Sequence, residues 1–134
     1  MLTTKESILT KDDLKSEIVL IPEWGDSVRV WMLTGADRDA YEQLLIEQRG
    51  PDVGTNVKNI RARLAAFCVR DDNNERLFLD AEIDALGKKN AKALDRIYEV
   101  AYRLNAFGRR EVEELAGNSG GGQAAAFVSD SPAT

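Results

Sequence analysis

The stretch from Asn90 to Phe107 constrains the fold most strongly, because its apolar residues follow the period of one helix face. Charged residues fall on the opposite side, as in an amphipathic helix. Asn90 is a suitable N-cap, and Gly108 is the residue type that commonly ends a helix. We therefore expect one long helix over residues 90–107, with the other elements packed on its apolar face. That face comprises Ala91, Leu94, Ile97, Tyr98, Ala101, Leu104 and Asn105.

Two runs of strand-forming residues precede this helix. Residues 16–21 are rich in aliphatic side chains and end at Pro22, and residues 27–33 alternate in the manner of a strand. We expect a β-hairpin with a loop of about five residues. An isolated two-stranded ribbon is marginal in water. The hairpin should therefore pack on helices or pair with another subunit.

Shorter helical patterns account for most of the remaining chain, and each is bounded by capping or helix-breaking residues. Together these elements predict an α+β fold that is mainly α-helical, with the N-terminal β-hairpin packed on about four to five helices. The further helices are expected at residues 3–9, 10–15, 35–48 (stopped by Gly50 and Pro51), 57–70, 81–86 (capped by Asp80) and 109–116, with a polar connector at 50–56 and a short extended piece at 76–78.

A chain of 134 residues is long enough for one domain with a modest core. We expect this single globular domain to cover residues 1–116. From Gly117 onwards glycine dominates, and glycine raises the entropic cost of fixing the backbone. Residues 117–134 are therefore predicted to form a flexible Gly/Ala/Ser-rich tail.

The net charge and the hydropathy of the chain limit which compartments and partners are expected. The net charge is −5, and residues 71–86 carry six acidic residues and one basic residue, so basic patches elsewhere are offset and no nucleic-acid partner is expected. No run approaches the roughly 18 apolar residues of a membrane helix. The N-terminus also lacks the basic start and apolar core of a signal peptide. A cytoplasmic protein without a membrane partner is the expectation.

The residue types usually found in catalytic and metal sites are scarce. There is no histidine, the commonest general base, and the single cysteine, Cys68, lies on an apolar helix stripe where a buried core thiol is expected. Asp71 to Glu82 has oxygen ligands at some calcium-loop positions, but Arg76 stands where that loop requires glycine. A solvated turn explains the same residues. We expect no enzyme, no cofactor and no metal site.

Several short motifs, in their order and spacing over about residues 1–116, resemble the tail assembly chaperones of phages and prophages with long, non-contractile tails. The motifs are residues 21–30, Leu33-Thr34-Gly35 with Asp37-Arg38-Asp39, residues 59–64, the turn at 72–78, Leu86-Gly87-Lys88-Lys89, residues 93–97 and Leu104-Asn105.

The resemblance implies a non-enzymatic protein that binds and solubilises the tape-measure protein and is displaced as tail tube protein polymerises. It implies action in the host cytoplasm during assembly and absence from the mature virion, and many such phages make a longer frameshifted form. Self-association is also expected. An alternative is another phage structural subunit for head–tail joining or tail completion, or a small regulatory nucleic-acid-binding module. The residues predicted to contact partners are Trp24, Trp31, Tyr41, Ile97, Tyr98 and Leu104.

Overall fold

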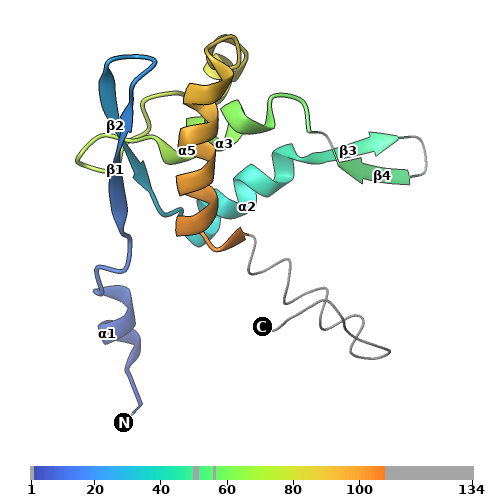
Figure 1. Ribbon diagram of the computed structural model, residues 1–134. Coiled ribbons are helices and arrows are strands. Elements are labelled where there is room, and N and C mark those ends of the chain that lie inside the picture. The colour runs from blue at the N-terminus through green and yellow to red at the C-terminus, as the bar shows by residue number, and fades with distance from the viewer. Residues whose placement is uncertain (1, 50–51, 56, 108–134) are drawn as a thin grey trace, which may run out of the picture. The chain divides into compact units, whose positions relative to one another are not determined.

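The computed structural model describes residues 2–49, 52–55 and 57–107 (Figure 1). It confirms the α+β, mainly helical fold class, with a hairpin at the N-terminal side and five α-helices in the described ranges. The elements are α1 (Lys5–Leu9), β1 (Ser16–Ile21), β2 (Asp26–Trp31), α2 (Gly35–Leu44), β3 (Ile46–Arg49), β4 (Asp52–Thr55), α3 (Ile60–Cys68), the 3-10 turn η1 (Asp80–Glu82), α4 (Ile83–Leu86) and α5 (Ala91–Leu104).

The predicted N-terminal hairpin is present, with a loop one residue shorter than expected. β1 and β2 are antiparallel, and Ile21 pairs with Asp26, which leaves four residues in the loop. Gly25 takes a left-handed conformation with φ 70°, and its N–H donates to the Ile21 carbonyl at 3.0 Å. This backbone conformation suits glycine, which has no Cβ to clash. Ile21 and Val30 are fully buried on the inner face of the hairpin.

The second edge of β2 has a partner that the sequence pattern did not indicate. Val30 and Val69 form an antiparallel bridge, and the N–H of Arg70 donates to the Arg29 carbonyl at 3.1 Å. Arg70 in turn forms a bridge with Arg76, but the other two residues of the predicted extended piece at 76–78 lie in a bend. Isolated bridges lack the length of a strand pattern, so residue spacing does not reveal them.

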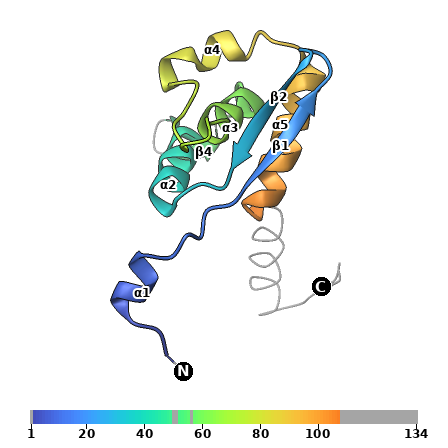
Figure 2. The same ribbon diagram turned by 90° about the vertical axis from the view of Figure 1, so that its left-hand side faces the viewer.

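The core lies where α3 packs against α5, β2 and α4. Both views show α5 running alongside the β1–β2 hairpin (Figures 1 and 2). α3 is buried almost all round, because Leu64, Phe67 and Cys68 and the alanines between them have neighbours on every side. α5 contributes a seam of buried residues in which two alanines permit close approach. The seam comprises Ala93, Leu94, Ile97 and Ala101.

The start of the long helix agrees with the prediction. The side-chain oxygen of Asn90 accepts from the N–H groups of Lys92 at 2.8 Å and Ala93 at 3.2 Å. α5 ends at Leu104, three residues before the predicted end, and Ala106 takes a left-handed conformation with φ 55°. The predicted stop at Gly108 and the predicted helix at 109–116 lie outside the described residues.

One predicted helical segment is absent, and another is shorter than predicted. Residues 10–15 contain no helix, since Thr10 ends α1 by donating its hydroxyl to the Glu6 carbonyl at 2.9 Å. The helix expected at 35–48 ends at Leu44, and an antiparallel β3–β4 hairpin replaces its last turn and the connector. Residues 46–49 instead pair as strand β3 with β4, and this pairing ends the helix well before Gly50 and Pro51.

Other boundaries shift by a few residues. Thr4 caps α1, with its hydroxyl accepting from the N–H of Ser7, so α1 begins two residues after the predicted start at residue 3. α3 begins at Ile60 after left-handed Asn59 and ends at Cys68, two residues before Arg70, because Val69 is extended. Asp80 is not an N-cap but the first residue of η1, before α4.

Contacts divide the chain into two units, Met1–Leu104 and Asn105–Thr134. Every element described above belongs to the first unit. In the second unit only residues 105–107 are described. The predicted domain end at residue 116 and the predicted tail at 117–134 lie outside the described residues, so both stay predictions.

Candidate partner-binding surface

Two of the residues predicted to contact partners are core residues in this fold. Tyr41 is buried, with its ring edge-on to Phe67 at a centroid distance of 5.7 Å, and burial raises the pKa of its hydroxyl above the ordinary range. Ile97 is fully buried in the α5 seam. Both side chains are therefore occupied within the subunit. Their contact with a partner stays a prediction, and it requires the core to open.

The two tryptophans are half-buried and differ in how their indole N–H groups are satisfied. Trp31 donates to the Asp71 carbonyl at 3.0 Å, which fixes the end of β2 to the turn after α3. The Nε1 atom of Trp24, in the hairpin loop, is buried and meets no acceptor among the described residues. Buried polar groups of this kind are rare and costly. The Trp24 N–H therefore costs free energy in this fold, whereas the Trp31 N–H contributes a hydrogen bond.

Tyr98 and Leu104 are also half-buried, on the part of α5 away from its N-cap. The Tyr98 ring stacks on Tyr102 with centroids 5.5 Å apart. Stacked aromatic pairs contribute beyond their buried area and hold each other in place. Part of the Tyr98–Tyr102 pair is thus accessible. The contact of Tyr98 and Leu104 with a partner stays a prediction.

Two large apolar side chains of the hairpin are exposed on the outer face of β1, and neither is among the residues predicted to contact partners. Ile18 and Leu20 are 63% and 64% exposed. Their cross-strand neighbours are Arg29 and Ser27, which form a polar border. We call these four residues the outer hairpin face. The sequence of residues 16–21 does indicate this exposure. Aliphatic side chains occur on both faces of the strand, and a two-layer fold buries only one of these faces.

β1 is also an edge strand. Among the strands described, it pairs with β2 alone, so one row of its backbone N–H and C=O groups is not used in a ladder. Natural proteins protect such edges with charges or covering elements, because exposed apolar edges recruit other chains. The β1 edge and the outer hairpin face together provide hydrogen-bonding groups and apolar area for a polypeptide.

Two ion pairs hold the hairpin against α5. Glu23 accepts from Arg96 at 2.9 and 3.0 Å, and Glu17 accepts from Arg103 at 2.8 Å. Hydrogen bonds from these arginines lower the pKa of both carboxyls. The inner face of the hairpin therefore packs on α5. The outer hairpin face remains the side directed away from the core.

A second exposed apolar pair lies on the segment after α3, which we call the strap (residues 71–79). Leu77 and Leu79 are 53% and 61% exposed, and Phe78 between them is half-buried. Residues 77 and 78 lie in a bend, and the exposed fractions show that the strap presents both leucines at the surface. No period-based pattern identified this pair, because the strap is neither a helix nor a full strand.

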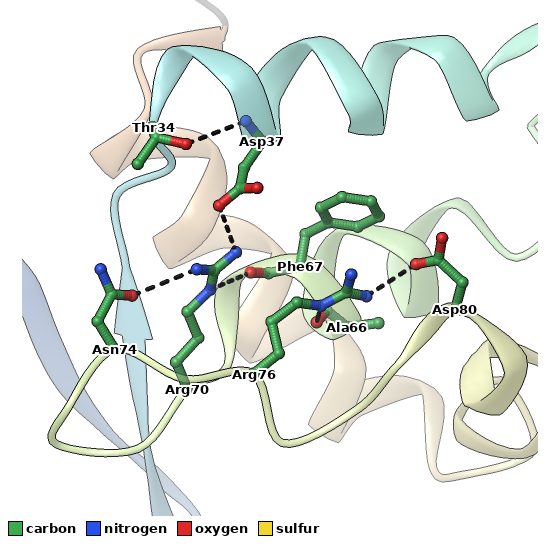
Figure 3. Close-up of polar contacts among 8 residues, drawn as sticks. All are labelled: Thr34, Asp37, Ala66, Phe67, Arg70, Asn74, Arg76 and Asp80. Carbon is green, nitrogen blue, oxygen red and sulfur yellow. Dashed lines mark hydrogen bonds and ion pairs between the residues drawn. The ribbon is translucent and has the colours of Figure 1, made fainter.

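Two arginines anchor the strap to the helices beneath it (Figure 3). Arg70 is 7% exposed and donates to the Phe67 carbonyl at 2.7 Å, to Asp37 at 3.0 Å and to Asn74 at 3.4 Å. These contacts join the end of α3, the start of α2 and the strap. A rigid planar guanidinium is well suited to bonding several acceptors at fixed angles.

Arg76 forms the second anchor. Its guanidinium lies 4.2 Å from the centroid of the Phe67 ring and donates to the Ala66 carbonyl and to Asp80, both at 3.0 Å (Figure 3). A cation over an aromatic face is attracted by the ring quadrupole. The positive charge of Arg76 is therefore turned inward and paired.

The carboxylate of Asp71 builds the turn that the sequence spacing compared with a calcium loop. Its Oδ1 accepts from the N–H groups of Asn73 at 2.8 Å and Glu75 at 3.0 Å. Asp80 is paired with Arg76, and Glu82 accepts from the N–H of Leu79. Within the described ranges, no group of three or more histidine, cysteine or acidic residues is placed to hold a metal ion. Cys68 is buried.

None of the helices in the described part of the chain combines the length and apolarity needed to span a membrane. Comparisons with models of protein families, with curated proteins and with solved structures found no match.

Proposed function

We propose that this protein is a non-enzymatic phage tail assembly chaperone that binds and solubilises the tape-measure protein while the tail tube assembles. The observation that carries the proposal is the outer hairpin face, where Ile18 and Leu20 are exposed on an edge strand. The motif order described above supplies the family, and the exposed surface supplies the physical means. Its place of action would be the host cytoplasm, with the client released to tail tube protein.

The surface suits a polypeptide client with exposed apolar segments. Binding surfaces gain affinity from a small apolar centre, and a polar rim keeps them soluble when free. Here Arg29 and Ser27 border the two aliphatic side chains. The unused backbone groups of β1 add hydrogen bonds that do not depend on the client's side chains. A client of great length and repetitive character can be held by such a surface at many positions.

Co-expression with the tape-measure protein from the same phage or prophage genome tests the proposal. We expect the soluble fraction of the tape-measure protein to rise several-fold with the wild-type chain, and the two to co-purify. The variant Ile18→Ser/Leu20→Ser should lose most of this effect, because it removes the apolar area but leaves the core untouched. The matched control is Ile8→Ser/Leu9→Ser, which changes an exposed apolar pair on α1, a helix with no buried residue.

Urea unfolding of each purified variant separates binding from folding. Both double variants should unfold within about 1 kcal/mol of the wild type, as is usual for exposed positions. A tape-measure protein that stays insoluble with the wild-type chain would contradict the proposed function. Equal solubilisation by the wild type and Ile18→Ser/Leu20→Ser would show that the outer hairpin face does not bind the client.

A further inference from the structure

We propose that the strap is a docking site for a basic amphipathic helix of the client. This inference rests on the proposed function for the existence of a client, and it specifies the chemistry of the segment that binds. Leu77 and Leu79 form the apolar contact, and the carboxylates before and after them select positive charge. The occupant is identified by three properties of the strap: exposure, charge and fixed shape.

The leucines are exposed although the segment around them is firmly held. Both are more than half exposed, while Phe78 between them is half-buried and Arg70 below them is almost fully buried. The N–H of Leu77 donates to the Val69 carbonyl at 3.3 Å, which adds a backbone contact to the arginine anchors. A pre-ordered apolar pair binds without the entropic cost of ordering a loop.

The charge around the leucines is predominantly negative. Residues 71–86 contain six acidic residues, and the burial pattern places all six at the surface: Asp71, Asp72, Glu75, Asp80, Glu82 and Asp84.

Arg76, the one basic residue of that stretch, is turned onto Phe67 and offsets only one of the six carboxylates, that of Asp80. Arg29 offsets Asp72, whose side chain is 88% exposed in the pair. The outward field is therefore negative. It favours a partner with lysine or arginine beside its apolar stripe and disfavours an acidic one.

A helix fits the apolar pair better than an extended strand does. The strap is short and irregular, and the single bridge that joins Arg76 to Arg70 is its only described strand-like pairing, so it offers no long ladder for strand addition. Two leucines two residues apart present a compact contact, which the i, i+3 and i+4 residues of a helix can enclose. Basic residues on the flanks of that helix then meet the carboxylates.

Two synthetic helical peptides with the same leucine pattern test the inference, one with lysine and one with glutamate on the flanking positions. We expect the full-length protein to bind the lysine peptide at least about tenfold more tightly, as measured by fluorescence anisotropy. Added salt should weaken this binding, because exposed charges are screened. Equal binding of the two peptides, or no binding of the lysine peptide, overturns the inference.

Variants locate the site. Leu77→Ser/Leu79→Ser should weaken binding of the lysine peptide about tenfold or more, and Glu75→Gln should weaken it a few-fold without weakening the binding of the glutamate peptide. The control Ile8→Ser/Leu9→Ser should bind as the wild type does. Unchanged binding by Leu77→Ser/Leu79→Ser overturns the site. A loss of self-association in that variant, seen by sedimentation without peptide, would make a second copy the occupant and overturn it as well.

The tape-measure protein distinguishes this inference from the proposed function. If the wild type and Leu77→Ser/Leu79→Ser solubilise it equally, the strap is not the docking site but the chaperone function stands. If the lysine peptide binds as expected while the wild type fails to solubilise the tape-measure protein, the proposed function falls and the strap serves another basic partner.

Discussion

Replacing Arg70 with methionine tests whether this guanidinium holds the strap to the helices. Methionine keeps much of the apolar stem and removes all the donors. The lost contacts are those to the Phe67 carbonyl at 2.7 Å, to Asp37 at 3.0 Å and to Asn74 at 3.4 Å. The first two have good geometry, and the third is long enough to contribute little.

The expected loss of unfolding free energy is about 2–3 kcal/mol. Breaking a fully buried ion pair costs about 3–5 kcal/mol, because the remaining charge is stranded without water. The Asp37 side chain is 38% exposed, so water replaces part of the lost bond and lowers the figure. The Phe67 carbonyl adds the cost of an unsatisfied buried acceptor.

Arg61→Met is the matched control. Arg61 also lies on α3 and also forms an ion pair, with Asp95, but its side chain is 55% exposed and that of Asp95 is 47% exposed. Exposed pairs contribute about 0–1 kcal/mol. Urea unfolding should therefore separate the two variants by more than about 1 kcal/mol, with Arg70→Met the less stable.

Hydrogen exchange adds a local measurement. In Arg70→Met, exchange should become faster than in the wild type at two amides of the strap. These are the amide of Asn74, which donates to the Asp71 carbonyl, and that of Leu77, which donates to the Val69 carbonyl. The exchange of α5 amides should increase less. Asp37→Asn added to Arg70→Met should cost little more, since the carboxylate has already lost its partner. Equal stability of Arg70→Met and Arg61→Met, with unchanged exchange in the strap, would refute this account of the anchor.

Three further predictions follow from individual contacts. Trp24→Phe should change the unfolding free energy less than Trp31→Phe, because the first deletes an unsatisfied buried N–H and the second deletes the bond to Asp71; equal losses in urea unfolding would contradict this. Glu17 and Glu23 have a lowered pKa, so their stabilisation is complete above the ordinary carboxyl value of 4.5 and disappears as the pH falls through the lowered values. In Glu17→Gln/Glu23→Gln the unfolding free energy should therefore fall less steeply as the pH is lowered. An unchanged pH dependence would contradict a stabilising role of the two ion pairs. Gly87→Ala should cost about 1 kcal/mol, because a Cβ would meet Asn59 Oδ1 at 2.7 Å and displace its contact with Asp84, whereas Gly35→Ala, with open space around it, should be neutral or slightly stabilising.

The elements with a strong period were predictable from the sequence. α5 and its cap at Asn90 follow from spacing and side-chain chemistry, and the β1–β2 hairpin follows from its aliphatic runs. The end of α2 at Leu44 did not follow, because the competing β3–β4 pairing depends on cross-strand contacts that no local pattern displays.

The candidate surface was less predictable than the fold. Tyr41 and Ile97 are predicted to contact partners because they belong to apolar helix stripes. The core buries such stripes, and both residues are buried. Ile18 and Leu20 are exposed because β1 has aliphatic residues on both faces and only one face meets α5. The strap leucines depend on two arginine anchors formed by tertiary contacts. Spacing alone carries no information on such contacts.

The most direct test of the central claim is light scattering as denatured tape-measure protein is diluted into buffer with increasing amounts of this protein. If the chain acts by covering apolar segments of another polypeptide, scattering should fall to a plateau at a fixed ratio of the two proteins, without nucleotide or metal. Ile18→Ser/Leu20→Ser should need a clearly higher ratio than Ile8→Ser/Leu9→Ser. Scattering that stays the same at every ratio would contradict the account.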